Sequence, residues 1–401
     1  MKRETRLAVG DHARQQTTAD LHGRRCHVMV STPLQYLNAK ELVELLGSRE
    51  RYLVILEQHY RLRDFVDLPG FANWTRIDTV KAGRLLPHVR LSLLLRCLAD
   101  VLADVATHRR IAQMLVRWPT SELLVIGNPN EVLHLDFASQ GGGQELLICD
   151  DGTSTLSGFA DRSRSKWLRR RLLGIRRPLL DNAWQFTAYA DVRPGTRTLH
   201  NTYDYLRSYV MKRSPGGGAA RDIWFLGQPL VEFGVTSLSA YLELVQSIRS
   251  GTYAEQRVLY WPHPRECRDN LARLASATGM EVVSRSGPIE LELVRQPLPP
   301  ARVATLYSSA YQSCYAIFGD AVAFDVFEPH QDYWQSGHSE VRIMRDCYAY
   351  FRSHVRPPHR FFRQENAHDW QCCAPFLGMS GESDATPVLD NAGYPPARGE
   401  T

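Results

Sequence analysis

Short apolar runs alternate along most of the chain with longer stretches whose apolar residues recur every three or four positions. The first pattern is typical of buried β-strands and the second of amphipathic helices. Their regular alternation predicts an α/β protein built on parallel sheets.

Both halves of the chain show this alternation. In the first half the expected strands are 26–30, 51–56, 123–126 and 145–149, and the expected helices are 36–46 and 91–114. In the second half the expected strands are 223–226, 257–261, 281–284, 303–307 and 321–327, and the expected helices are 236–248, 267–277 and 340–351. The run IELELV at 289–294 alternates in polarity, which indicates one more short strand.

A break between the halves suggests two domains. The segment SPGGGAA at 214–220 combines proline, three glycines and small residues, as an interdomain linker does. We therefore expect a disordered leader at 1–23, a first domain at 24–213, a linker at 214–221, a second domain at 222–377 and a disordered tail at 378–401. The length of 401 residues suits two such domains, with a ligand cleft between them.

Composition narrows the possible partners. The net charge of +5 is mild for 401 residues, so a dedicated nucleic-acid binder is not expected.

The eight cysteines form no CxxC pair and lie near no histidine at zinc-ligand spacing, which predicts free thiols, a reducing compartment and no structural metal. The first 25 residues lack the apolar core of a secretory signal, and no stretch is apolar enough to span a membrane. We expect a cytoplasmic protein.

Asp150-Asp151-Gly152 follows an apolar strand in the first half. Ligands bind beyond the carboxyl ends of strands in sheets of this kind, so one of the two carboxylates is a candidate general base. The structural alternative is a strand-to-loop turn, in which Asp-Gly is common. Two adjacent aspartates without a second acidic cluster make a poor magnesium site, so no metal is expected.

Polar residues also follow strands in the second half. His263, between two prolines and ahead of a helix, is a candidate phosphate ligand or a structural turn residue. Ser308 and Ser309 offer hydroxyls and backbone N–H groups to phosphate oxygens, or serve as a helix cap. The remaining candidates are Gly227, Gln228, Pro264 and Glu290, each of which could also have a purely structural role.

The ordered set of Asp-Asp-Gly, Leu-Gly-Gln-Pro-Leu, His-Pro, Pro-Ile-Glu and Ser-Ser resembles the bacterial sialyltransferases, among them the capsule polysialyltransferases and the lipooligosaccharide sialyltransferases. The resemblance begins at STPLQYLNA, near residue 28, and extends to about residue 327. It implies a GT-B-like fold of two Rossmann-like domains facing each other across a cleft. It also implies metal-independent, inverting transfer from a CMP-activated sialic acid or related nonulosonic acid to a hydroxyl of a glycan or glycolipid acceptor.

The resemblance assigns a role to each candidate. Asp150 or Asp151 would be the general base of an acceptor-side first domain. In a CMP-sugar-binding second domain, His263 would bind the departing phosphate together with Ser308 and Ser309. Glu290 would contact the cytosine or ribose, and Gly227, Gln228 and Pro264 would line the donor pocket. Ser31, Gln35 and Asn128, at first-domain strand ends, are candidate acceptor contacts. No cofactor is implied.

The segment 162–177 interleaves eight Arg and Lys residues with a tryptophan and aliphatic residues. Such a stretch is expected on an anionic membrane surface, here the inner face of the membrane. Contact with an anionic glycan or lipid acceptor, or a solvated helix face, would produce the same pattern.

Two other functions fit the same residues. One is transfer of another CMP-activated acid sugar such as Kdo, for which the CMP-binding motifs would look alike. The other is a non-catalytic protein that binds an anionic polysaccharide. Loss of turnover with retained binding after Asp150 and Asp151 are replaced distinguishes the enzymes from the binder.

Overall fold

The computed structural model describes residues 20–57, 62–66, 73–82, 93–152, 155, 164–175, 180, 182–189, 197–213, 220–284, 287, 289–295, 299–308, 310–335, 338–366 and 369–373. Most of the predicted leader, linker and tail lies outside these residues. At the edges of the described part, Leu21 is buried in the first core and a strand begins at Ala220.

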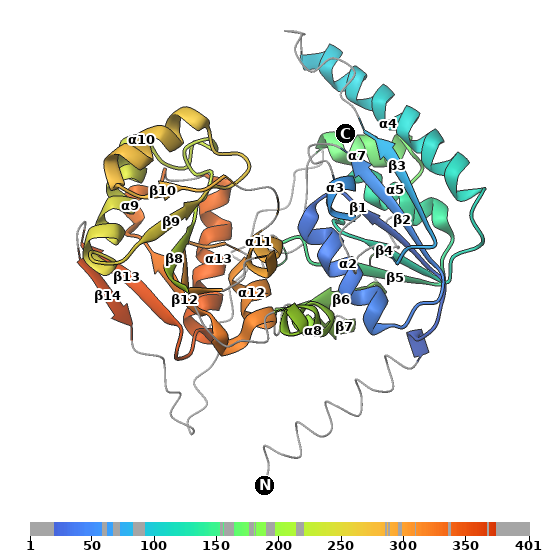
Figure 1. Cartoon of the computed structure of the whole chain (residues 1–401). Coiled ribbons are helices and arrows are strands. Elements are labelled where there is room, and N and C mark those ends of the chain that lie inside the picture. The colour runs from blue at the N-terminus through green and yellow to red at the C-terminus, as the bar shows by residue number, and fades with distance from the viewer. Residues whose placement is uncertain are drawn as a thin grey trace, which may run out of the picture.

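The first half forms a seven-stranded parallel sheet (Figure 1). Its order is β3 (Arg76–Lys81), β2 (Arg51–Glu57), β1 (Cys26–Val30), β4 (Leu123–Ile126), β5 (Glu145–Cys149), β6 (Trp184–Thr187) and β7 (Arg197–His200). The helices are α2 (Pro33–Leu45), α3 (Arg63–Val66), α4 (Leu93–Leu115), α5 (Val132–Gly141), α7 (Arg164–Leu172) and α8 (Asp204–Arg213). This strand order is that of a Rossmann-type sheet.

Apolar side chains cover both faces of this sheet. Val28 and Val30 of β1 pack in one core with α2 and α8, whereas Met29 packs in the other core with α4 and α5. A strand buried on both faces is apolar at nearly every position, which explains the apolar runs that predicted β1, β4 and β5 at their exact bounds.

The second half repeats the same order. Its sheet runs β10 (Glu281–Val282), β9 (Val258–Trp261), β8 (Ala220–Leu226), β11 (Pro300–Thr305), β12 (Ala323–Glu328), β13 (Arg360–Asn366) and β14 (Asp369–Cys373), and the β13–β14 pair is antiparallel. The helices are α9 (Leu238–Thr252), α10 (Arg268–Thr278), α11 (Ile289–Arg295), α12 (Ala310–Phe318) and α13 (Ser339–His354). Two Rossmann-like α/β sheets, the arrangement of a GT-B-like fold, confirm the predicted fold class.

The strand expected at 289–294 is wrong: these residues lie in helix α11. Ile289, Glu290 and Leu293 are all buried, because three- and four-residue spacing places them on one face of the helix. The sequence analysis also missed β3, β6, β7, β13 and β14, which are short, polar or near a sheet edge.

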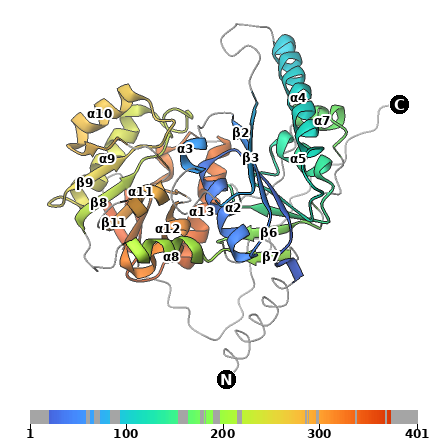
Figure 2. The same cartoon turned by 45° about the vertical axis from the view of Figure 1, so that its right-hand side comes forward.

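The two halves meet through α8 and α12, which lie side by side in both views (Figures 1 and 2). Ile317 of α12 packs in the first core, and Arg207 of α8 donates to the carbonyl of Ala316 at 3.1 Å. The second half is therefore anchored against the sheet of the first.

Candidate active site

Asp150 and Asp151 follow β5, and their side chains have different surroundings. The Asp150 carboxylate is buried and accepts hydrogen bonds from Thr187 Oγ1 at 2.9 Å and from the backbone N–H of Ala188 at 2.8 Å. Burial raises the pKa of Asp150 to about 7. Asp150 thus fixes the end of β5 to the end of β6.

Asp151 is half-buried and accepts hydrogen bonds from two of the predicted acceptor-side residues. Gln35 Nε2 donates to Oδ1 at 2.8 Å, and Asn128 Nδ2 donates to Oδ2 at 2.6 Å. Ser31 completes the group, because its N–H and hydroxyl both donate to Gln35 Oε1, at 2.8 and 3.1 Å. The structure therefore joins Ser31, Gln35, Asn128 and Asp151 in one network at the carboxyl ends of β1, β4 and β5.

Burial is also the main cause that raises the pKa of Asp151, to about 6. The hydrogen bonds from Gln35 and Asn128 lower the pKa, and the charge of Glu131 raises it. A carboxylate with a pKa near neutrality is ionised at pH 7 and basic enough to take a proton from a hydroxyl.

Gly127 and His134, which the sequence analysis did not single out, support this network. A Cβ at Gly127 would lie 2.3 Å from Gln35 Oε1, so only glycine leaves room for the Gln35 side chain. The buried His134 ring accepts the N–H groups of Gly127 and Asn128 through Nδ1, both at 3.2 Å. Burial lowers the pKa of His134 to about 3, so the ring is neutral and Nδ1 can accept.

We expect His134→Leu to lower activity about tenfold and stability by about 1 to 3 kcal/mol, because the Asn128 N–H loses its acceptor and the Gly127 N–H keeps only the Met29 carbonyl. His134→Asn, whose side-chain oxygen can take the place of Nδ1, is the matched control and should lose less. The rate of transfer and the urea midpoint of both variants test this. Equal losses would show that His134 matters only through its size.

The backbone of Asp150 is held from behind by α2. Asn38, fully buried, donates through Nδ2 to the Asp150 carbonyl at 3.0 Å. Asn38 in turn accepts from Asn201 Nδ2 at 3.2 Å and from the hydroxyl of Tyr203. These contacts fix the main chain from which Asp151 projects.

In the second half, Glu266 connects the strand ends that carry Gly227 and His263. Its Oε2 accepts the N–H of His263 at 2.5 Å, and its Oε1 accepts the Tyr260 hydroxyl, also at 2.5 Å. A Cβ at Gly227 would lie 2.3 Å from Glu266 Oε2, so glycine is required for this approach. The structure thus brings two predicted donor residues together through a carboxylate that the sequence analysis missed.

Gln228 belongs to the same group. Its N–H donates to the Tyr241 hydroxyl at 3.3 Å, and the hydroxyls of Tyr241 and Tyr260 are 2.9 Å apart. The ends of β8 and β9 are therefore linked by a buried chain of polar groups.

The turn of His263 and Pro264 is accessible to solvent: the imidazole is half-buried and Pro264 is exposed. His263 Nδ1 accepts the N–H of Arg265 at 3.2 Å. In the neutral ring this places the proton on Nε2, which is then a donor.

Ser308 and Glu290 each contact a residue of α12. The Ser308 hydroxyl accepts the N–H of Ala310 at 3.2 Å, so this serine caps the helix. Glu290 is buried in α11 and accepts the Ser313 hydroxyl at 2.6 Å. Ser309 lies outside the described residues.

A short series of contacts runs from the acidic pair to the second half. Ala188, whose N–H is held by Asp150, accepts Gln312 Nε2 of α12 at 2.9 Å through its carbonyl. The next residue, Tyr189, packs edge-on against Tyr350 of α13 with ring centroids 5.3 Å apart. The end of β6 is therefore the junction between the Asp150 turn and the helices of the second half.

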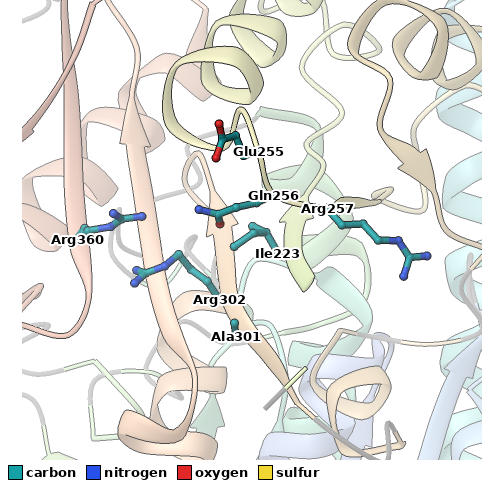
Figure 3. A pocket seen from close by; sticks show the side chains of 7 residues that line it. All are labelled: Ile223, Glu255, Gln256, Arg257, Ala301, Arg302 and Arg360. Carbon is teal, nitrogen blue, oxygen red and sulfur yellow. The ribbon is translucent and has the colours of Figure 1, made fainter. Parts of the chain in front are cut away.

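A cavity of about 560 Å³ lies at the other end of the second sheet. Its lining residues are Ile223, Glu255, Gln256, Arg257, Ala301, Arg302 and Arg360 (Figure 3). These residues precede β9 or lie in β8, β11 and β13, mostly at the amino ends of the strands, whereas Gly227, His263 and Ser308 follow the carboxyl ends. The cavity is therefore separate from the predicted donor residues.

Four of the seven cysteines whose thiols are described are buried, and all seven are free. Within the described residues, no three His, Cys, Asp or Glu side chains are grouped to hold a metal ion. No helix in that part of the chain has the length and apolar character to cross a membrane.

No protein-family model matches the chain, and no curated protein matches it. Among solved structures it is similar to an α/β-galactoside α-2,3-sialyltransferase from Photobacterium phosphoreum, with 9% identity over 80% of this chain and 95% of that one and a TM-score of 0.46. It is also similar to MurG from Acinetobacter baumannii, with 10% identity over 84% and 86% and a TM-score of 0.41. A third is the UDP-GlcNAc 2-epimerase from Methanocaldococcus jannaschii, with 11% identity over 86% and 94% and a TM-score of 0.44.

Proposed function

We propose that this protein is a metal-independent, inverting glycosyltransferase that moves a sialic acid, or a related nonulosonic acid, from a CMP-sugar to a hydroxyl of a glycan or glycolipid. The observation that carries the proposal is the Asp151 carboxylate, held by Gln35 and Asn128 at the carboxyl end of β5 with its pKa raised to about 6. Support also comes from the second Rossmann-like sheet, where Gly227, Gln228 and His263 share one polar network.

The two aspartates have different roles in this proposal. Asp151, half-buried, takes the proton from the acceptor hydroxyl, and the hydroxyl oxygen bonds to the anomeric carbon of the sugar. Asp150, buried and bound to Thr187 and Ala188, is a positioning residue that holds the turn. The sequence alone does not distinguish the two carboxylates.

Departure of CMP breaks the bond between the anomeric carbon and a phosphate oxygen. The transition state is oxocarbenium-like, so stabilising the leaving phosphate contributes more than activating the acceptor. His263 Nε2–H donates to that phosphate. The Ser308 hydroxyl, which accepts the N–H of Ala310 in the helix cap, donates its own proton to the same phosphate, and Ser309 keeps the phosphate-binding role that the sequence predicts for it. Glu290 contacts the nucleoside, and Gly227, Gln228 and Pro264 shape the donor pocket.

The pH dependence of the rate follows from the pKa of Asp151. We expect kcat/KM to rise about tenfold per pH unit below pH 6 and to level off above it, because only the ionised carboxylate accepts a proton. The rise in kcat/KM up to pH 6 should remain in Asp150→Asn. In Asp151→Asn the residual kcat/KM should not depend on pH in this range. A wild-type rate that is flat between pH 4.5 and 7 contradicts this role.

The donor class is tested by nucleotide binding. Calorimetric titration should show CMP binding to the wild-type protein in EDTA, with affinity lowered about tenfold in His263→Ala through loss of one phosphate contact. Arg352→Ala, a change in an exposed ion pair of the same half, is the matched control and should bind normally. Absence of CMP binding would contradict the donor assignment. CMP binding without turnover of any CMP-sugar would favour the non-catalytic binder.

A further inference from the structure

Helix α7 turns its apolar side chains outward. The helix has nine residues. Of these, Trp167 is 54% exposed, Leu168 48% and Leu172 56%. At helical spacing these three residues and Arg171 lie on one side, and all four are exposed.

The opposite side of α7 carries cations and faces the protein. Lys166, Arg169 and Arg170 are half-buried, and Arg169 pairs with Asp104 of α4, its Nη2 donating to Oδ1 at 2.8 Å. Both views place α7 beside α4 and α5 (Figures 1 and 2). This ion pair fixes the rotation of the helix, so the apolar side cannot turn inward without breaking it.

This orientation is the reverse of that of an ordinary surface helix. Such a helix buries its apolar stripe and exposes its charges, because exposed apolar area costs free energy in water. Three large apolar side chains on one face are therefore a surface for something apolar to contact.

The charge of the exposed side indicates which kind of partner contacts it. Residues 164–172 contain no acidic residue, and the Arg171 guanidinium lies 5.5 Å from the centre of the Trp167 ring. A tryptophan beside leucines, with an arginine at its edge, suits the boundary between anionic headgroups and acyl chains.

We propose that the outward side of α7, formed by Trp167, Leu168, Arg171 and Leu172, docks the protein on an anionic lipid bilayer. From the sequence, the whole segment 162–177, with its interleaved basic, aromatic and aliphatic residues, is expected on the membrane. In the structure Lys166, Arg169 and Arg170 lie on the protein side of α7, so the proposed contact is confined to the exposed apolar residues and Arg171. The inference does not depend on the proposed transferase activity, since binding needs no substrate.

Vesicle sedimentation tests the proposal with the full chain. We expect the protein to bind vesicles of phosphatidylcholine with one quarter phosphatidylglycerol. Leu168→Ser with Leu172→Ser should weaken binding at least about tenfold, because the two exposed leucines proposed to enter the bilayer are lost. Val116→Ser, at an 86% exposed apolar position at the end of α4, is the matched control and should bind like wild type.

Arg171→Ala separates the charge from the apolar contact. It should weaken binding to the anionic vesicles about fivefold and leave the weaker binding to pure phosphatidylcholine unchanged. No binding by wild type, or equal binding by wild type and the double serine variant, would overturn the proposal. So would a change from dimer to monomer in the double variant, because the face would then be an interface between copies of the chain.

Discussion

Asp151→Asn is expected to lower the rate of sugar transfer by about 10²- to 10⁴-fold, the usual contribution of a general base. The amide keeps the size of the side chain and can still accept from Asn128 or Gln35, so the fold should persist. Because the proposed donor residues lie in the second half, affinity for CMP should change less than twofold. Steady-state kinetics and calorimetry on the same preparation measure both quantities.

Asp150→Asn is the comparison that tests the division of roles. It should lower activity less than Asp151→Asn and stability more, because the Asp150 carboxylate is buried between Thr187 and Ala188. The reverse pattern, with activity lost only in Asp150→Asn, would make Asp150 the base and Asp151 the structural residue.

Asp325→Ala is expected to destabilise the protein by about 3 kcal/mol, the lower end of the range for breaking a buried ion pair, because the side chains of Arg302 and Arg360 are 21% and 38% exposed. Asp325 is fully buried in β12 and binds two guanidinium groups, with Arg302 Nη1 at 2.5 Å and Arg360 Nε at 2.9 Å. It also accepts the buried hydroxyl of Tyr253 at 2.5 Å. Removing the carboxylate leaves adjacent cations uncompensated beneath the cavity that they line.

The matched control is Asp222→Ala, at the amino end of β8. Asp222 pairs with Arg257 at 3.2 Å, but the arginine side chain is 61% exposed, so the expected loss is below about 1 kcal/mol. Equilibrium urea unfolding compares the two variants. Similar midpoints would contradict the central role of Asp325 in the second core.

The sequence predicts strands best where both faces are buried. β1, β4 and β5 are central strands whose every residue is apolar apart from His27 and Glu145, and their predicted bounds are exact. β3, with the sequence RIDTVK, lies at the sheet edge with charged residues exposed, so its pattern does not differ from that of a loop. The run at 289–294 failed because six residues fit both the strand and the helix period.

Among the candidate site residues, those that directly follow a strand could be predicted from the sequence. Ser31, Gln35 and Asn128 are predicted together as strand-end residues; Ser31 and Asn128 do follow strands, whereas Gln35 lies in α2 and reaches Asp151 from there. Asn38 and His134 lie within helices, and their side chains bind backbone groups of residues elsewhere in the chain. No local sequence pattern therefore identifies them as part of the site. Glu266 is similar, since its contacts with His263 and Tyr260 depend on the packing of β9 against its following turn.

The measurement that tests the central proposal most directly is donor turnover without metal. Purified protein in EDTA is incubated with CMP-Neu5Ac or CMP-Kdo and a panel of galactosides and sialosides, and CMP and the glycan product are quantified. We predict equal amounts of CMP and sialylated product, with turnover lost in Asp151→Asn and His263→Ala. Release from CMP-Kdo alone would replace the donor sugar, and no release from either donor would contradict the proposed function.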